Sequence, residues 1–259
     1  MEIAETIRFA ALSVFLYMTA LFFVALKRRD NSIADVAWGM GFVLVSWTTL
    51  LFFGEFTNRQ LIANVLVLIW GVRLSIRIYL RNRGKGEDIR YRRWREEWGR
   101  SFIVRSYFQV FLLQGFLMLL NLSPVLFINT GDSAALTLLD GFGVLVWLVG
   151  FYFEAVSDWQ LDRFMRDPGN RGIMMDRGLW RYSRHPNYFG EVVMWWGIYM
   201  LALSAPSGWI SIFGPATITL LIVFVSGIPM TEKLMESNPS FAEYRRRTSV
   251  FIPWFPKDS

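Results

Sequence analysis

Four sets of polar side chains interrupt otherwise apolar stretches of this 259-residue chain, and they are the residues best suited to chemistry. They are Asp35, the pair Arg73 and Arg77, the pair Glu154 and Asp158, and the pair Asn187 and Glu191. Both members of each pair project from one helix face, because residues spaced i, i+4 are neighbours on a helix. A charged side chain in a bilayer is costly unless it faces a partner or a wet cavity. Each set is therefore a candidate functional site.

The elements that must position these residues are long apolar helices. Hydrophobic residues make up 54% of the chain and charged residues only 19%, against about 25% charged in soluble domains. A helix needs about 20 apolar residues to cross the hydrocarbon core. No signal-peptide cleavage pattern precedes the first run, so it is expected to be retained. We predict an all-α, polytopic membrane protein, a single domain over 1–259 with seven spans at 7–26, 32–53, 61–80, 107–129, 138–160, 188–205 and 209–230.

The basic residues predict the orientation of these spans. With the N-terminus outside and the C-terminus inside, the cytoplasmic segments 27–31, 81–106, 162–187 and 231–259 hold 23 of the 27 Lys and Arg residues. Cytoplasmic loops of membrane proteins carry such an excess. Basic loops next to anionic lipid also explain most of the net charge of +6, so nucleic acid is not expected as a partner. No obligate protein partner is evident.

This orientation brings all four polar sets into the cytoplasmic half of the membrane. We expect four helices to line one polar cavity that opens to the cytoplasm and accepts a large anion, with an apolar partner entering from lipid. The alternative is that these residues form buried ion pairs that only fix helix packing, although such pairs stabilise weakly compared with apolar contacts.

The segment 177–191 is the densest polar and aromatic stretch. Pro186 excludes a regular helix through His185 and suits a first helical position, so a helix is expected to start there. Helix starts bind anions well, and Arg181, Arg184 and His185 precede this one. His185 alone is equally well explained as a capped loop histidine. The arginines 245–247 near the C-terminus form either a solvated face or a lid over the anion.

Composition and motifs exclude several classes of site. The chain has no cysteine and one histidine, which excludes disulfides, thiolate chemistry and a multi-histidine metal centre. No metal ligand set is expected. There is no G-x-G-x-x-G turn and no P-loop, so a nucleotide would have to be held by the membrane chamber itself.

Five segments together resemble the steroid 5α-reductase family, in particular its bacterial branch. They are NSIADVAWGMGF (31–42), WGVRLSIRIYLRNRGKGED (70–88), SDWQLDRFMRDPGN (157–170), GLWRYSRHPNYFGE (178–191) and FAEYRRRTSVFIPW (241–254). The resemblance implies a membrane-embedded reductase that transfers hydride from NADPH to the C=C bond of a lipophilic enone such as a Δ4-3-oxosteroid. It also implies a bacterial inner-membrane location with the cofactor on the cytoplasmic side.

The resemblance also implies roles for individual residues. The family pairs a carboxylate with a tyrosine as proton donor, which points to Asp35. Trp70 and Gly71 stand at the expected place of the tyrosine, so Tyr79, the nearest phenol on that helix, is its candidate. The implied cofactor-binding residues are Arg77, Lys85, Glu154, Asp158, Arg166, Tyr182, Arg184, His185, Asn187 and Glu191.

Two other classes remain open. The segment RHPNYFGE also resembles isoprenylcysteine methyltransferases, so a membrane methyltransferase that uses S-adenosylmethionine is the main alternative. A seven-helix transporter or receptor is the third, and it predicts no cytosolic anion pocket.

Overall fold

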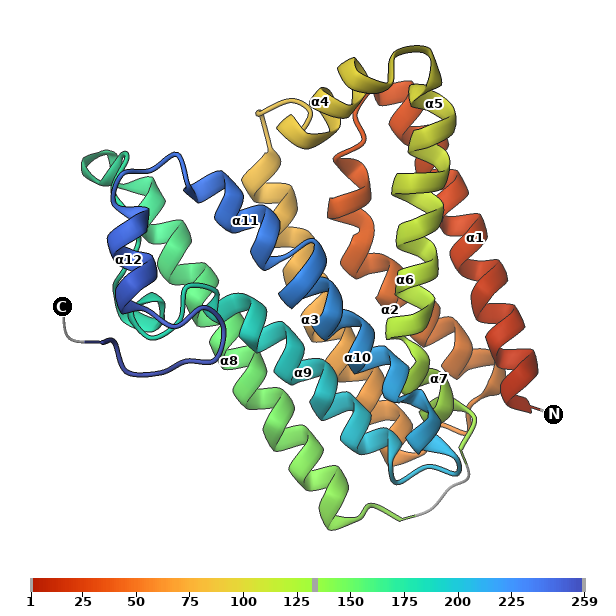
Figure 1. Cartoon of the computed structure of the whole chain (residues 1–259). Coiled ribbons are helices and arrows are strands. Elements are labelled where there is room, and N and C mark those ends of the chain that lie inside the picture. The colour runs from red at the N-terminus through yellow and green to blue at the C-terminus, as the bar shows by residue number, and fades with distance from the viewer. Residues whose placement is uncertain (1, 132–134, 258–259) are drawn as a thin grey trace. The chain divides into compact units, whose positions relative to one another are not determined.

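The computed structural model describes residues 2–131 and 135–257, and it confirms the all-α prediction (Figure 1). Within these ranges every regular element is a helix. The predicted domain 1–259 and the predicted cytoplasmic segment 231–259 also include residues outside the described ranges.

The α-helices vary from four to 29 residues. They are α1 (Glu2–Arg28), α2 (Ile33–Phe53), α3 (Asn58–Asn82), α4 (Ile89–Trp98), α5 (Phe102–Arg105), α6 (Leu113–Asn121), α7 (Ser123–Asn129), α8 (Leu138–Arg166), α9 (Pro186–Ala202), α10 (Phe213–Leu220), α11 (Ile228–Met235) and α12 (Phe241–Arg247). Shorter 3₁₀ and π turns join several of them. They are η1 (Gly99–Ser101), η2 (Ser106–Leu112), η3 (Pro168–Asn170), η4 (Gly178–Arg181), η5 (Gly208–Ile212) and η6 (Leu221–Val225).

Six helical stretches in the described residues are long and apolar enough to cross a membrane, so the chain is a multi-pass integral membrane protein. They correspond to α1, α2, α3, the stretch 89–121, α8 and the stretch 208–235. The predicted span at 188–205 coincides with α9, which has 17 residues and is about 25 Å long at the α-helical rise. The count of seven and the orientation therefore stay predictions.

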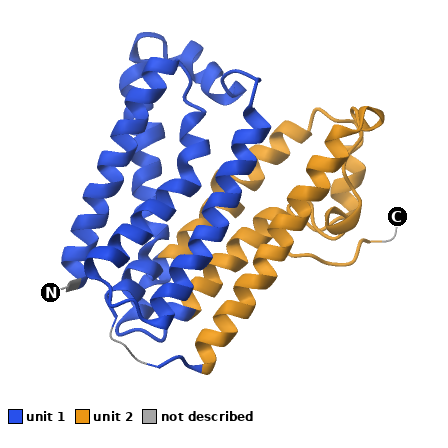
Figure 2. Cartoon of the chain, turned by 180° about the vertical axis from the view of Figure 1, so that it is seen from behind, with its two compact units in different colours: residues 1–137, 201–213 blue, residues 138–200, 214–259 orange. Residues whose placement is uncertain are grey.

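The chain divides into two compact units (Figure 2). Unit 1 comprises residues 1–137 and 201–213, and unit 2 comprises 138–200 and 214–259. Asp35, Arg73 and Arg77 lie in unit 1, whereas the other two polar pairs lie in unit 2. The common chamber for all four sets remains a prediction.

In unit 1, glycine brings α2 and α3 into backbone contact. A Cβ atom on Gly39 would collide with the carbonyl oxygen of Gly71, and one on Gly71 would lie 2.6 Å from the oxygen of Gly39. Small residues promote such close helix packing in membranes. The polar side chain of Asn129 on α7 adds interhelical hydrogen bonds, because it accepts from Asn64 on α3 at 2.7 Å and donates to Thr49 on α2 at 2.9 Å.

In unit 2, glycines spaced seven residues apart on both α8 and α9 play the same role. A Cβ on Gly150 would lie 2.6 Å from the oxygen of Gly190, and a Cβ on Gly197 would lie 2.7 Å from the oxygen of Gly143. Residues seven apart lie on nearly the same face of a helix. The two helices therefore meet along a seam of small residues, which fixes where their polar residues stand.

Candidate active site

The carboxyl group of Asp35 forms the centre of a polar cluster in unit 1. Asp35 stands in the first turn of α2. It accepts a hydrogen bond from the hydroxyl of Tyr91 at 2.6 Å, and its other oxygen lies 2.6 Å from Nη2 of Arg90. The side chain of Asp35 is only 17% exposed. This geometry joins a carboxyl and a phenol at the distance of a strong hydrogen bond.

The start of α4 places Arg90 and Tyr91 against Asp35. Asp88 caps α4 by accepting from the backbone N–H of Arg90 at 2.9 Å, and it also pairs with the guanidinium group of that residue at 2.9 Å. The backbone N–H of Asp88 donates to the hydroxyl of Ser32 at 2.8 Å, which ties α4 to the residue before α2. Burial alone would raise the pKa of Asp88, but the hydrogen bonds and charge of Arg90 outweigh it and hold that pKa below its ordinary value.

A second set of bonds holds the same segment in place. Glu87 accepts from the backbone N–H of Asn31 at 3.0 Å and pairs with Arg95 at 2.7 Å. The side chain of Asn31 donates to Ser106 at 2.9 Å. The loop before α4 is therefore fixed on the N-terminal end of α2, so the position of Tyr91 does not depend on one contact.

The tyrosine that meets Asp35 is not the one expected from the sequence. Tyr79 lies on α3 and its side chain is 53% exposed, whereas Tyr91 is only 2% exposed and bonded to Asp35. Of the predicted cofactor residues in unit 1, Arg77 is half-buried on α3. Lys85 is exposed in a loop between Gly84 and Gly86, both of which have positive φ angles.

In unit 2 the packing of α9 on α8 gathers one group of predicted cofactor residues. A Cβ on Gly190 would lie 2.9 Å from the Cβ of Glu154, so the first turns of α9 pass directly beside Glu154. Glu154 and Asp158 are both buried on α8. Asn187 and Glu191 flank Gly190 on the first turns of α9, and both are half-buried. As predicted, α9 begins at Pro186.

The segment before α9 is fastened to α8 by side-chain bonds. The side chain of Gln160 accepts from the backbone N–H of Leu179 at 2.9 Å, and the indole of Trp180 donates to the carbonyl of Ser157 at 2.9 Å. The buried hydroxyl of Tyr244 on α12 donates to the carbonyl of Trp180 at 2.6 Å. These bonds fix the approach to the helix start.

Arg184 and His185 meet a carboxylate that the sequence did not reveal as their partner. Arg184 lies 2.7 Å from Glu232 of α11, and it donates to the carbonyls of Thr248 and Arg245 at 2.6 and 3.2 Å. His185 is 1% exposed, and its Nε2 lies 3.3 Å from the same carboxylate. Burial lowers the pKa of His185 from 6.5 to about 4, so the ring is neutral at pH 7.

A cavity of about 680 Å³ opens under the loop that follows α8. Its apolar lining is rich in methionine and includes Phe164, Met165, Met175 and Trp180. Three of its polar lining residues are Arg166, Asn170 and Arg171. Its size falls within the range of about 300–1,000 Å³ that is typical of small-molecule sites. An apolar pocket with guanidinium groups suits a ligand that joins a flat ring to phosphate.

The sequence reasoning missed Tyr91, Arg90 and Glu232. All three stand in segments that the sequence predicts to be basic cytoplasmic loops or the C-terminal tail. A usable signal existed for the first two, because Asp88 directly before the segment IRYRRWREEW matches a helix N-cap pattern. That pattern predicts a short helix at 89–98, although not what it packs against.

Comparison with known proteins places this chain in a family. A family model described as a protein of unknown function, DUF1295, matches residues 21–248. The chain belongs to the DUF1295 family. An uncharacterised protein of Schizosaccharomyces pombe is 26% identical to this DUF1295 protein over 271 residues, which cover 92% of this chain and 77% of that protein.

Part of the chain is also similar to named enzymes. The 3-oxo-5-alpha-steroid 4-dehydrogenase 1 of Bos taurus is 34% identical over 113 residues, or 43% of this chain and 40% of the enzyme. The Homo sapiens protein of the same name is 35% identical over 115 residues, or 44% of this chain and 40% of the enzyme. The DUF1295 protein thus matches less than half the length of these enzymes. No solved structure gives a significant match.

Proposed function

We propose that this DUF1295 protein is a membrane reductase that uses NADPH to reduce the C=C bond of a lipophilic enone, of which a Δ4-3-oxosteroid is one example. The observation that carries the proposal is the Tyr91–Asp35 hydrogen bond of 2.6 Å, backed by Arg90. Partial similarity to 3-oxo-5-alpha-steroid 4-dehydrogenases supports reductase chemistry on such a substrate.

Reduction of an enone needs a proton donor at the carbonyl oxygen. When hydride adds to the β-carbon, negative charge develops on that oxygen, and a positioned acid must meet it. In our proposal the hydroxyl of Tyr91 donates to the oxygen and receives a proton from the carboxyl group of Asp35 in turn. The proton passes from Asp35 through Tyr91 to the enolate, and Asp35 is left as a carboxylate.

Burial explains how Asp35 can serve as the source of the proton in this proposal. Its side chain is only 17% exposed, and burial disfavours the charged form of a carboxyl group. Arg90 also pairs with Asp88 at 2.9 Å, so its charge is shared between two carboxyl groups. After the transfer, Nη2 of Arg90 at 2.6 Å stabilises the new carboxylate. Arg90 thus favours the state after proton transfer, in which Asp35 is a carboxylate.

In our proposal the cavity of unit 2 holds the phosphate and adenine parts of the cofactor. Arg166 and Arg171 suit bidentate contacts to phosphate, and the apolar lining suits an adenine ring. Asn187, Glu191, Glu154 and Asp158 are proposed to hydrogen-bond the amide and ribose groups. Arg184 is proposed to position the start of α9, since most of its donors are engaged. NADPH, when bound, supplies the hydride.

Enone reduction by purified protein, followed by NADPH consumption and product mass, tests the proposal. Tyr91→Phe should lower kcat by about 100-fold or more, the usual range for loss of a general acid, and keep its affinity for NADPH. Arg166→Ala should weaken NADPH binding by about tenfold, as expected for one lost charge-assisted contact. The exposed Arg163→Ala, one turn earlier on α8, is the matched control and should bind NADPH normally.

Tyr79→Phe separates the two tyrosine assignments. If Tyr91 is the proton donor, as its contact with Asp35 suggests, Tyr79→Phe should have normal turnover. If Tyr79 is the donor, as predicted from the sequence, Tyr79→Phe should lose turnover and Tyr91→Phe should keep it. Methyl transfer from labelled S-adenosylmethionine, with no NADPH consumption against a panel of enones, would instead establish the methyltransferase alternative.

A further inference from the structure

The C-terminal residues 250–255, which we name the tail segment, are fixed to the protein by backbone bonds. The backbone N–H of Arg184 donates to the carbonyl of Ser249 at 2.8 Å, and the hydroxyl of Ser183 donates to the carbonyl of Phe251 at 2.8 Å. The backbone N–H of Trp254 donates to the carbonyl of Tyr182 at 2.9 Å. The tail segment is therefore held in a fixed path along residues 182–184.

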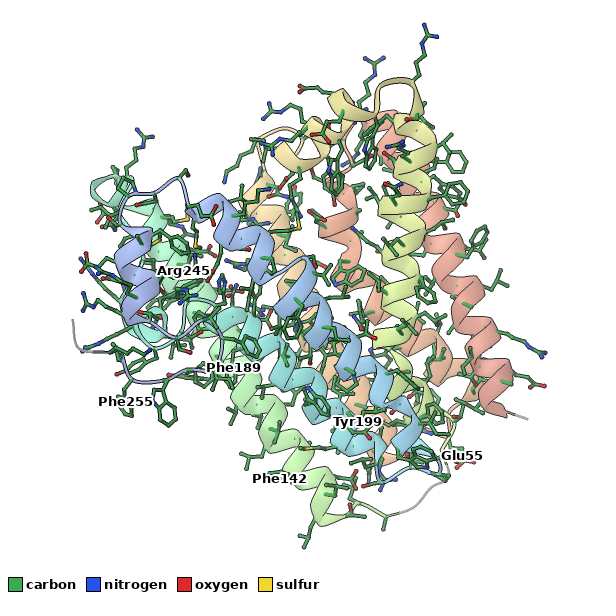
Figure 3. The ribbon with its side chains drawn as sticks, viewed as in Figure 1. Glu55, Phe142, Phe189, Tyr199, Arg245 and Phe255 are labelled. Carbon is green, nitrogen blue, oxygen red and sulfur yellow. The ribbon has the colours of Figure 1, made fainter. Side chains whose placement is uncertain are left out.

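This path turns a row of large apolar side chains outward. Phe251 packs against Phe189 of α9, with 5.7 Å between the ring centroids, whereas its neighbours face away from the protein. Ile252, Trp254 and Phe255 are 62%, 70% and 76% exposed. Figure 3 shows Phe255 projecting away from the ribbon.

These exposed side chains are not explained by a membrane span. The candidate spans end at Met235, well before the tail segment. Exposed apolar side chains on the spans are expected to face lipid, but a rigid apolar row outside them needs a partner of its own.

The chemistry around the row fits a lipid interface. Trp and Tyr are enriched at the boundary between hydrocarbon and water, and Lys and Arg beside it attract anionic headgroups. Exposed cations border the tail segment. Before the segment, the hydroxyl of Thr248 donates to the backbone carbonyl of Arg181 at 3.5 Å. After it, the backbone N–H of Lys257 donates to the backbone carbonyl of Arg247 at 2.9 Å. The ring of Tyr182 lies 6.0 Å from that of Phe255 and extends the aromatic surface.

We propose that the tail segment docks into the interfacial layer of a bilayer that contains anionic lipid. Ile252, Trp254 and Phe255 insert below the headgroups, while Arg181 and Lys257 contact lipid phosphates. The proposal does not depend on the reductase function.

The natural absence of cysteine allows a direct test in the full-length protein. Ile252→Cys, with Phe255→Cys as a second reporter, is labelled with a nitroxide in nanodiscs of zwitterionic lipid with or without phosphatidylglycerol. Collision with oxygen, which concentrates in lipid, is compared with collision with a water-soluble nickel chelate. Ala242→Cys, exposed on α12, is the control.

We expect the oxygen-to-nickel collision ratio at both tail positions to exceed that at position 242 severalfold. Phosphatidylglycerol should raise it further, and Arg181→Gln with Lys257→Gln should remove that increase. A ratio equal to that at position 242 places the tail segment in water and overturns the proposal. Protection from both reagents, independent of the lipid used, identifies a protein contact and overturns it as well. A ratio that does not respond to anionic lipid refutes the role of the cations.

Discussion

At the scale of single residues, the buried side chains of Arg184 and His185 in unit 2 share one carboxylate. Glu232 accepts from Arg184 and lies within 3.3 Å of His185, whose ring stacks on Tyr188 at 5.4 Å. A neutral imidazole can donate its Nε2–H to this carboxylate, so the contact needs no charge on His185. Removing Glu232 would leave the buried guanidinium group of Arg184 without its anion, which is costly.

The low pKa of His185 predicts how stability changes with pH. Its pKa is about 4 in the folded protein against an ordinary 6.5. Between these values the unfolded chain binds a proton that the folded protein does not, so stability falls as the pH falls. From pH 7 to pH 5 this histidine should cost about 2 kcal/mol.

His185→Gln keeps a donor for Glu232 and removes this titration. Thermal melts in detergent at pH 7 and pH 5 should therefore show a smaller loss in the variant than in the parent protein. An equal loss in both proteins would mean that folding does not lower the pKa of His185. Carboxylates that titrate in this range contribute to both proteins, so the comparison cancels them.

At the scale of elements, the glycine seam between α8 and α9 controls the geometry of four predicted cofactor residues. Gly190 brings α9 against the backbone of Glu154, and Gly150 contacts Gly190 in return. Any side chain at Gly190 must separate the helices, because the atoms it meets are mainly backbone and cannot move aside.

Gly190→Ala should therefore destabilise the protein by about 1–3 kcal/mol, the usual cost of overpacking. Gly141→Ala on α8 is the matched control, since a Cβ there meets nothing within 4 Å. The control should melt at the same temperature as the parent protein or higher, because alanine favours the helix. Melting of both variants at the parent temperature would show that the two helices separate freely.

At the scale of the whole molecule, the distribution of Lys and Arg predicts the orientation, and α9 decides the number of spans. With 17 residues, α9 is shorter than the roughly 20 residues that usually cross a bilayer. If it crosses, the chain spans the membrane seven times and α12 is cytoplasmic.

Single cysteines in the cysteine-free chain test this topology. A maleimide that cannot cross membranes should label Glu55→Cys in intact cells, and should label Glu97→Cys and Ala242→Cys only after permeabilisation. Labelling of Ala242→Cys but not Glu97→Cys in intact cells would show that α9 does not cross. Labelling of Glu97→Cys but not Glu55→Cys in intact cells would reverse the predicted orientation.

The amino-acid sequence was enough to predict the properties that depend on neighbouring residues. Apolar run length predicted the long helices, and Pro186 predicted the start of α9, because φ restriction and hydropathy act locally. The pairs of side chains that meet could be found only from the three-dimensional fold. Asp35 pairs with Tyr91, 56 residues away, and Arg184 with Glu232, 48 residues away. Neither spacing follows a helical period, because both contacts depend on how a loop or a later helix folds back over a helix start.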